Sequence, residues 1–338
     1  MIQFFPAELL HIILACCAPG HLHTIAAVCH EWENATQDRR GTISKLCLAP
    51  FDIKKPFTCK IFGAPEGLSG IKDEGVTVFA SACASGALPL LTKLSLWWNQ
   101  IGDIGLSAFA AAVGNGALPN LKTLELGLNN IGDAGCTSFA SALGSGALPL
   151  LSDLCLEDNS IGEAGLTAFA TALTSGALPQ LQVLDLNSNR IGDSGLNVLA
   201  SACASGALSP LTALCLADNQ IGDAGIIALT TVLGNETRPL LQVLRLSLAD
   251  NQIGDAGVTA LALAVGSGAL SSLRELYLNC NQIGNVGLTA LATALSNGTL
   301  PLLTELSLYR NQIGDIGFSA LAAAVCSGSL PRIERIVC

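Results

Sequence analysis

The amino-acid sequence predicts an α/β repeat solenoid, with a parallel sheet on one side and helices on the other. One pattern recurs about every 30 residues over most of the 338-residue chain. Each copy holds a short stretch with apolar residues two apart, which indicates a strand. A longer stretch with apolar residues three and four apart indicates a helix. One strand and one helix cannot bury their apolar faces alone, so successive copies are expected to stack around a continuous core.

The first full copy, "LTKLSLWWNQIGDIGLSAFAAAVGNGALP", shows how each element is specified. Leu94 and Leu96 lie two apart and point to one face of a strand. The helix is predicted by an apolar stripe formed by Leu106, Phe109, Ala110 and Val113. Asp103 occupies the expected N-cap position of this helix. Pro119 prevents the helix from continuing and directs the chain into the next strand.

An asparagine closes every copy of the strand motif: Asn99, Asn129, Asn159, Asn189, Asn219, Asn251, Asn281 and Asn311. A buried side-chain amide can satisfy backbone groups that lose their partners where the chain leaves the sheet, so we predict a structural asparagine ladder. The spacing is about 30 residues except between Asn219 and Asn251, which are two residues further apart. Two is the strand period, so we expect a longer strand or a bulge within Leu241 to Asn251.

The pattern L-x-x-L-x-L-x-x-N-x-I-G-D-x-G resembles leucine-rich repeat proteins of the ribonuclease-inhibitor-like subfamily. Eight full copies run from Leu91 to about Leu330, after a degenerate copy from Gly67 to Pro89 in which Ser69 replaces the asparagine. The half copy "PRIERIVC" follows. The resemblance implies a curved horseshoe over residues 67–338, with parallel strands on the concave side and helices on the convex side. Residues 41–66 are expected to form an irregular connection, with a candidate first strand at its "LCL", and residues 1–40 a small helical segment.

The positions that vary between copies alternate with the leucines and therefore face away from the core. They can change without unfolding the protein, so we predict that they form a binding face for a protein partner. Aromatic and arginine residues, which dominate protein interfaces, stand at its two ends, and acidic residues stand in the middle. The residues are Trp97, Trp98, Glu125, Leu128, Glu157, Asp158, Asp185, Asp218, Arg245, Tyr277, Tyr309 and Arg310. The alternative is that these charges only keep an apolar solenoid soluble.

A second acidic row follows the asparagines: Asp103, Asp133, Glu163, Asp193, Asp223, Asp255 and Asp315, with Asn285 interrupting it. Stacked carboxylates can bind calcium, but acidic residues beside helix N-termini are favourable without a ligand. Helix capping is therefore the predicted role, and we expect no metal.

Charge and composition exclude several functions. Residues 61–338 carry ten Lys and Arg against twenty-one Asp and Glu, so there is no basic stripe for nucleic acid or for an anionic membrane surface. All four histidines fall within the first 30 residues, so no Ser-His-Asp or Cys-His site is expected on the repeats, and no cofactor is implied. The thirteen scattered cysteines fit reduced thiols in a cytoplasmic or nuclear protein rather than a secreted one.

The N-terminal stretch "FFPAELLHIILACCAPGHLHTIAAVCHEWENATQ" resembles an F-box, the helical module that docks on the Skp adaptor of cullin-type ubiquitin ligases. The residues expected to dock on the adaptor are Pro6, Leu9, Leu10, Ile13, Val28 and Trp32. These helices are alternatively a cap over the first repeat's core. The sequence therefore predicts a non-enzymatic substrate receptor of a ubiquitin ligase. Two alternatives are a plain scaffold or sensor, and a regulator of a small GTPase like the Ran GTPase activators of this repeat subfamily.

Overall fold

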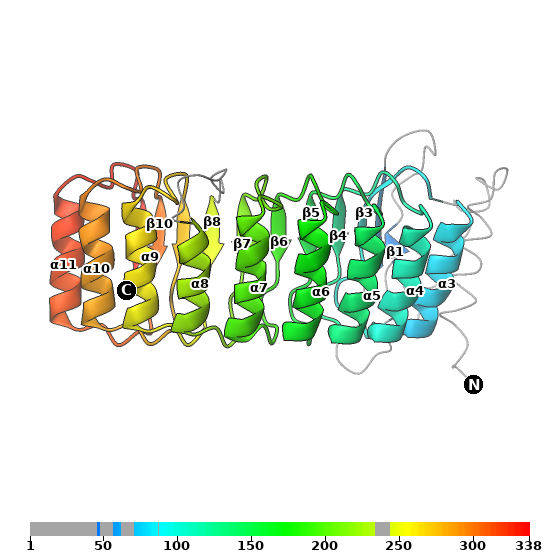
Figure 1. Ribbon diagram of the computed structural model, residues 1–338, viewed down its shortest axis with the longest axis horizontal. Coiled ribbons are helices and arrows are strands. Elements are labelled where there is room, and N and C mark those ends of the chain that lie inside the picture. The colour runs from blue at the N-terminus through cyan, green and yellow to red at the C-terminus, as the bar shows by residue number, and fades with distance from the viewer. Residues whose placement is uncertain (1–45, 48–56, 62–70, 87, 234–243) are drawn as a thin grey trace, which may run out of the picture. The chain divides into compact units, whose positions relative to one another are not determined.

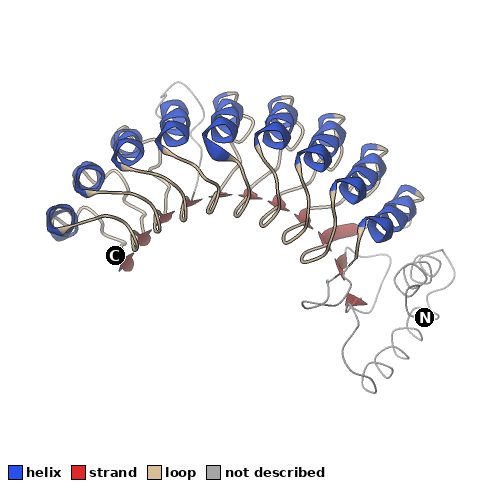
Figure 2. Ribbon diagram, turned by 90° about the horizontal axis from the view of Figure 1, so that it is seen from below, coloured by secondary structure: helices blue, strands red, loops and turns tan. Residues whose placement is uncertain are grey.

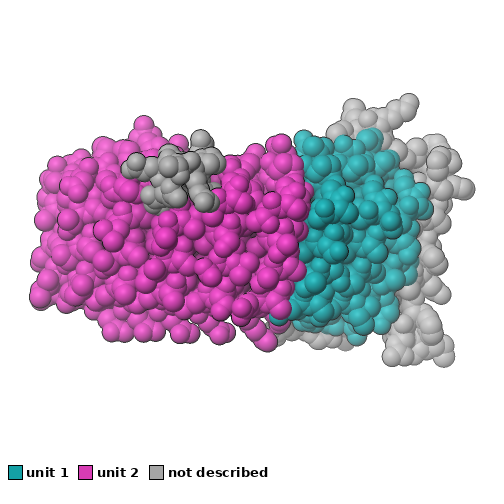
Figure 3. Space-filling view, viewed as in Figure 1, with its two compact units in different colours: residues 1–159 teal, residues 160–338 magenta. Residues whose placement is uncertain are grey.

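The computed structural model describes residues 46–47, 57–61, 71–86, 88–233 and 244–338 (Figure 1). The chain divides into two compact units, residues 1–159 and 160–338, which are described in turn (Figure 3). The F-box-like segment, with all of its predicted adaptor-docking residues, lies outside the described residues.

Unit 1 is a layer of strands covered on one side by helices (Figure 2). Its strands are β1 (Leu46–Cys47), β2 (Phe57–Ile61), β3 (Leu91–Ser95), β4 (Thr123–Glu125) and β5 (Asp153–Cys155). They pair in chain order, β1 antiparallel to β2 and the others parallel. Its described helices are α3 (Asp73–Ala84), α4 (Asp103–Gly114) and α5 (Asp133–Gly144).

Strand β1 lies in the candidate first strand at "LCL", as expected, whereas β2 corrects the expectation that the rest of residues 41–66 is irregular. Phe57, Cys59 and Ile61 alternate with polar residues, which is a strand pattern. The parallel pairing of β2 with β3 also supplies hydrogen-bond partners to a strand edge that would otherwise be bare. The repeated sheet therefore begins before the first recognisable copy of the motif.

Unit 2 repeats the same arrangement. Its strands, parallel and paired in chain order, are β6 (Val183–Asp185), β7 (Ala213–Cys215), β8 (Arg245–Ser247), β9 (Glu275–Tyr277), β10 (Glu305–Ser307) and β11 (Arg335–Val337). Its described helices are α6 (Glu163–Thr174), α7 (Gly192–Ala204), α8 (Asp223–Leu233), α9 (Asp255–Gly266), α10 (Asn285–Ser296) and α11 (Asp315–Cys326). In this unit the strands lie on the inner side and the helices on the outer side (Figure 2). The predicted fold class, a solenoid of alternating strands and helices, is confirmed.

The core lies between the sheet and the helices, and the leucine pattern specifies it. Leu94, Leu96, Leu106 and Phe109 are all at most 1% exposed. Full burial of one such side chain contributes about 1.5–3 kcal/mol relative to leaving it in water. The ring of Phe109 packs in a tilted arrangement against that of Phe139 in the next repeat, with ring centroids 6.4 Å apart, so the core is continuous between these copies.

The longer strand or bulge expected at the two-residue insertion is wrong. Strand β8 has three residues, like β7 and β9, and Arg245 and Ser247 pair in register with Ala213 and Cys215. Neighbours on both sides fix this register. The two additional residues therefore fall between Asp223, the first residue of α8, and Arg245. No described helix is long and apolar enough to cross a bilayer.

Candidate protein-binding face

The face of the sheet opposite the helices, called here the open face, carries four rows of side chains. In unit 1 the strand pairing defines a strand-start row (Lys93, Thr123, Asp153) and a central row (Ser95, Glu125, Cys155). Backbone hydrogen bonds beyond the strands continue this register into an exit row (Trp97, Gly127, Glu157) and a turn row (Trp98, Leu128, Asp158). In unit 2 the strand-start row is Val183, Ala213, Arg245, Glu275, Glu305 and Arg335. Sequence reasoning missed the strand-start row, although the period of two from the central row could have found it.

Register also resolves which residue of β8 belongs to the central row. Ser247 pairs with Cys215 and Tyr277, whereas Arg245 pairs with Ala213 and Glu275. Ser247 therefore belongs to the central row and Arg245 to the strand-start row.

The asparagines of the ladder lie at the strand exits and hydrogen-bond to the backbone of two repeats. The Asn129 side chain donates from Nδ2 to the carbonyl oxygens of Leu126 and Gly127, at 2.9 and 3.0 Å. It also donates to Leu96 of the preceding repeat at 3.0 Å, and its Oδ1 accepts from the Ile101 N–H at 3.1 Å. The same pattern recurs at Asn159, Asn251, Asn281 and Asn311, and partly at Asn99, Asn189 and Asn219.

The turn row has an unusual backbone. Its members in both units have φ between 48° and 56°, the left-handed region: Trp98, Leu128, Asp158, Ser188, Asp218, Asp250, Cys280 and Arg310. Aspartate is tolerated there, but a bulky residue is strained. Trp98 nevertheless occupies this position with its side chain 42% exposed, and Leu128 is half-buried beside it in the row.

The Trp97 side chain reaches past the repeat of β4 to Glu157, which lies two repeats further along the chain. Its indole Nε1 donates to Glu157 Oε1 at 3.0 Å, and it packs edge-on against Trp98 with ring centroids 5.8 Å apart. The path lies over Gly127, where an added Cβ would stand 2.8 Å from Trp97 Cδ1 and 2.7 Å from Glu157 Cγ. Glycine at this position therefore allows the aromatic and acidic side chains to meet.

Several charged residues of the open face satisfy one another. Lys93 pairs with Glu125, Arg245 Nε with Glu275, and Arg335 with Glu305 at 3.2 Å. The Tyr277 hydroxyl lies 3.1 Å from Glu275 and 3.2 Å from Glu305, and its ring centroid is 6.0 Å from the Arg245 guanidinium carbon. Burial, followed by the hydrogen bond with Glu275, raises the pKa of Tyr277 to about 12. Arg245 and Tyr277 thus share Glu275 as a partner, whereas Tyr309 and Arg310 are exposed.

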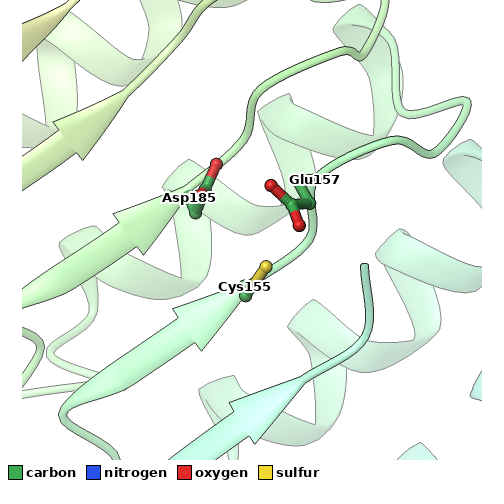
Figure 4. A group of neighbouring side chains, drawn as sticks. All are labelled: Cys155, Glu157 and Asp185. Carbon is green, nitrogen blue, oxygen red and sulfur yellow. The ribbon is translucent and has the colours of Figure 1, made fainter. Parts of the chain in front are cut away.

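The predicted acidic residues differ in their surroundings. Asp158 and Asp218 are exposed, while Glu125, Glu157 and Asp185 are half-buried. Asp185 ends β6 and accepts from the Asn187 N–H at 3.0 Å. Figure 4 shows Glu157 just beyond Cys155, the last residue of β5, and Asp185 on its own strand.

The second acidic row caps helices, but not the helices on which its members stand. Asp103 is the first residue of α4, whose N-cap is Gly102. Its Oδ1 instead accepts from Gly132 and Gly135 of the next repeat, at 2.7 and 2.9 Å, and so caps α5. The assignment of Asp103 as its own helix N-cap is therefore corrected. The reason is that stacking brings the Asp103 carboxylate next to the following repeat, where the first N–H groups of α5 need an acceptor.

The same cross-repeat cap is formed by Asp193, Asp223 and Asp255, and by Asn285, which therefore does not interrupt the row. Glu163 is different, because its side chain forms no such bond within the described residues. Helix α7, which it precedes by one repeat, begins at Gly192 with φ of 60°. The additional methylene of glutamate places its carboxylate differently from that of aspartate.

These features define a protein built from stacked strand–helix units, whose sequence variation is concentrated on the open face of the sheet. A leucine-rich repeat family model matches residues 87–110, 117–140, 178–200, 207–229, 242–262, 269–292 and 299–322. The chain is a leucine-rich repeat protein.

Solved structures that are similar to this chain include two bacterial proteins and a plant receptor. Internalin C2 from Listeria monocytogenes is 25% identical over 76% of this chain and 83% of its own, with a TM-score of 0.46. Internalin InlF from the same organism is 23% identical over 80% and 86%, with a TM-score of 0.35. A plant peptide hormone receptor, RGFR1 in complex with RGF2, is 17% identical over 77% of this chain but 36% of its own, with a TM-score of 0.41. No curated protein matches the chain.

Proposed function

We propose that this protein recognises another protein on the open face of its leucine-rich repeats and catalyses no reaction itself. The observation that carries the proposal is the tryptophan pair on the open face, in which Trp98 is exposed and Trp97 is half-buried. Trp98 is strained by its left-handed backbone and exposes a large ring, whereas glycine, asparagine or aspartate would fit the turn better. Trp, Tyr and Arg contribute much of the binding energy at protein interfaces. Trp97 packs against Trp98, and its hydrogen bond to Glu157 holds its ring in place.

We further propose that the protein is a substrate receptor of a cullin-type ubiquitin ligase, in the cytoplasm or nucleus, with repeats of the ribonuclease-inhibitor-like type. The support is the F-box-like spacing of Pro6, Leu9, Leu10, Ile13, Val28 and Trp32. In this arrangement the N-terminal segment binds the Skp adaptor and cullin follows through the adaptor. The open face holds the substrate.

The test is affinity capture from a eukaryotic lysate followed by mass spectrometry. Wild type is compared with a Leu9→Ala/Leu10→Ala variant and with a Trp97→Ala/Trp98→Ala variant. The matched control is Ile104→Ala, which removes an exposed apolar side chain from the helix side of the same unit. We expect Skp and cullin to disappear only with the leucine pair, and a separate set of proteins to disappear only with the tryptophan pair.

Two other results would change the assignment. If no ligase component is captured by wild type, the N-terminal segment is a cap and the protein is a scaffold or sensor. If a small GTPase is captured and its GTP hydrolysis is stimulated, the protein is a regulator of that GTPase. If the tryptophan pair and the control lose the same proteins, the open face around Trp97 is not the binding site.

A further inference from the structure

One cluster on the open face of unit 1 combines aromatic rings with carboxylates that lack a cation. The Trp–acid cluster consists of Trp97, Trp98, Glu157 and Asp158. Glu157 uses one oxygen to accept from Trp97, at 3.0 Å. Its other oxygen and the exposed Asp158 carboxylate have no side-chain hydrogen bond or ion pair within the described residues. The cluster is therefore negatively charged beside exposed aromatic surface.

No basic side chain of the described unit neutralises this cluster. In the open-face rows from β3 to β5 the one basic residue is Lys93, and its ammonium is paired with Glu125. A cation is therefore favoured at the cluster both by the carboxylates and by the electron-rich faces of the indole rings.

Unit 2 contains the same chemistry with the cation included. The Arg245 guanidinium carbon lies 6.0 Å from the Tyr277 ring centroid while Arg245 Nε bonds to Glu275. The Tyr277 hydroxyl also lies within hydrogen-bond distance of Glu275, at 3.1 Å. An aromatic ring, a carboxylate and an arginine thus form a complete trio. The Trp–acid cluster has the ring and the carboxylate and lacks the arginine.

We propose that the Trp–acid cluster binds an arginine side chain presented by the partner protein. This inference rests on the proposed function, in which the open face binds a protein. A guanidinium is planar and weakly hydrated, so it can stack on an indole while its N–H groups bond to a carboxylate. A lysine ammonium is more strongly hydrated and cannot present the same flat surface. The cluster therefore selects a partner segment that contains arginine rather than basic segments in general.

The test uses the full chain and three peptides of one length, acetyl-GRGRGRG-amide and its counterparts with lysine or citrulline in place of arginine. Citrulline has nearly the shape of arginine without its charge. Binding is followed by tryptophan fluorescence and by calorimetry at low salt. We expect the lysine peptide to bind at least about threefold and the citrulline peptide at least about tenfold more weakly than the arginine peptide.

Asp158→Asn is the test variant and Asp250→Asn the matched control, since both aspartates are exposed in the turn row with φ near 50°. Asparagine tolerates this backbone, so neither change should unfold the protein. We expect Asp158→Asn to weaken the arginine peptide about three- to tenfold and the control to leave its Kd unchanged. Equal affinity for the arginine and citrulline peptides, equal effects of the two variants, or no binding at millimolar peptide would overturn the inference.

The capture experiment separates this failure from that of the proposed function. If the tryptophan pair is needed to capture proteins but the arginine peptide does not bind, the open face is a binding site that recognises other chemistry. If the tryptophan pair is not needed for capture either, the proposed function and the arginine site both fail.

Discussion

Replacing Asn129 by leucine tests the role of the buried asparagines at the strand exits. The substitution removes four hydrogen bonds, three donated by Nδ2 and one accepted by Oδ1. Most of the groups left behind keep another partner. The carbonyl of Leu96 still accepts from Asn99, that of Leu126 from Asn159, and that of Gly127 from the Trp98 N–H.

The Ile101 N–H is different, because the Asn129 side chain is its acceptor and the residue is buried. One orphaned buried N–H costs about 1–3 kcal/mol, so this is the expected loss in the free energy of unfolding, rather than four times as much. Urea unfolding followed by circular dichroism measures it. The control is Asn130→Ala, an exposed neighbour for which a change within about 0.5 kcal/mol is expected. A loss for Asn129→Leu no greater than that of the control would refute the reasoning.

Three further outcomes are expected. Glu163→Asp should add a cross-repeat cap to α7 and raise the free energy of unfolding by about 0.5–1 kcal/mol; unchanged urea midpoints would count against it. Burial raises the pKa of the Cys136 thiol to about 12, so at pH 8 a disulfide reagent should modify the exposed Cys326 quickly and Cys136 only on unfolding, as mass spectrometry would show. In a Tyr309→Phe variant, Tyr277 is the one tyrosine left, and its ultraviolet titration should have a midpoint near 12 in the folded protein and near 10 in urea. Since the folded pKa is the higher one, stability due to Tyr277 is complete below pH 10 and is lost as the pH rises towards 12; coincident folded and unfolded midpoints would contradict this.

The fold could be predicted because its causes are local and repeated. The spacing of Leu94 and Leu96 determines a strand face, and the stripe containing Leu106 and Phe109 determines a helix face, in each copy. The strand at Phe57–Ile61 was missed because it lacks the leucine and asparagine signature, although its alternation was visible. The position of the two-residue insertion was missed because the motif reads equally well from either of two leucines until the pairing of β8 with β7 is known.

The site could be predicted only in part, because contacts between copies depend on how the copies stack. Asp103 lies at one fixed distance in sequence from its own helix and at another from the next, so spacing alone does not say which helix it caps. The bond between Trp97 and Glu157, 60 residues apart, was within reach of the sequence, since the glycine between them in the exit row marks an open path. The role of these residues in binding remains a prediction.

Within each unit, the cross-repeat caps and the asparagine bonds make the described boundaries between copies chemically alike, except where Glu163 precedes α7. At such a boundary a carboxylate accepts from the next repeat, as Asp103 does from the Gly132 N–H, and an asparagine oxygen accepts from the preceding repeat, as Asn129 Oδ1 does from the Ile101 N–H. Whole copies could therefore be inserted or deleted in unit 2, between Asp223 and Asp255 for example, with both junctions restored. Inserting half a copy would leave one helix without its cross-repeat cap and one buried backbone N–H without its asparagine acceptor. The hydrogen bonds at the junctions, rather than any single repeat, therefore allow the length of the solenoid to change only in steps of one complete copy.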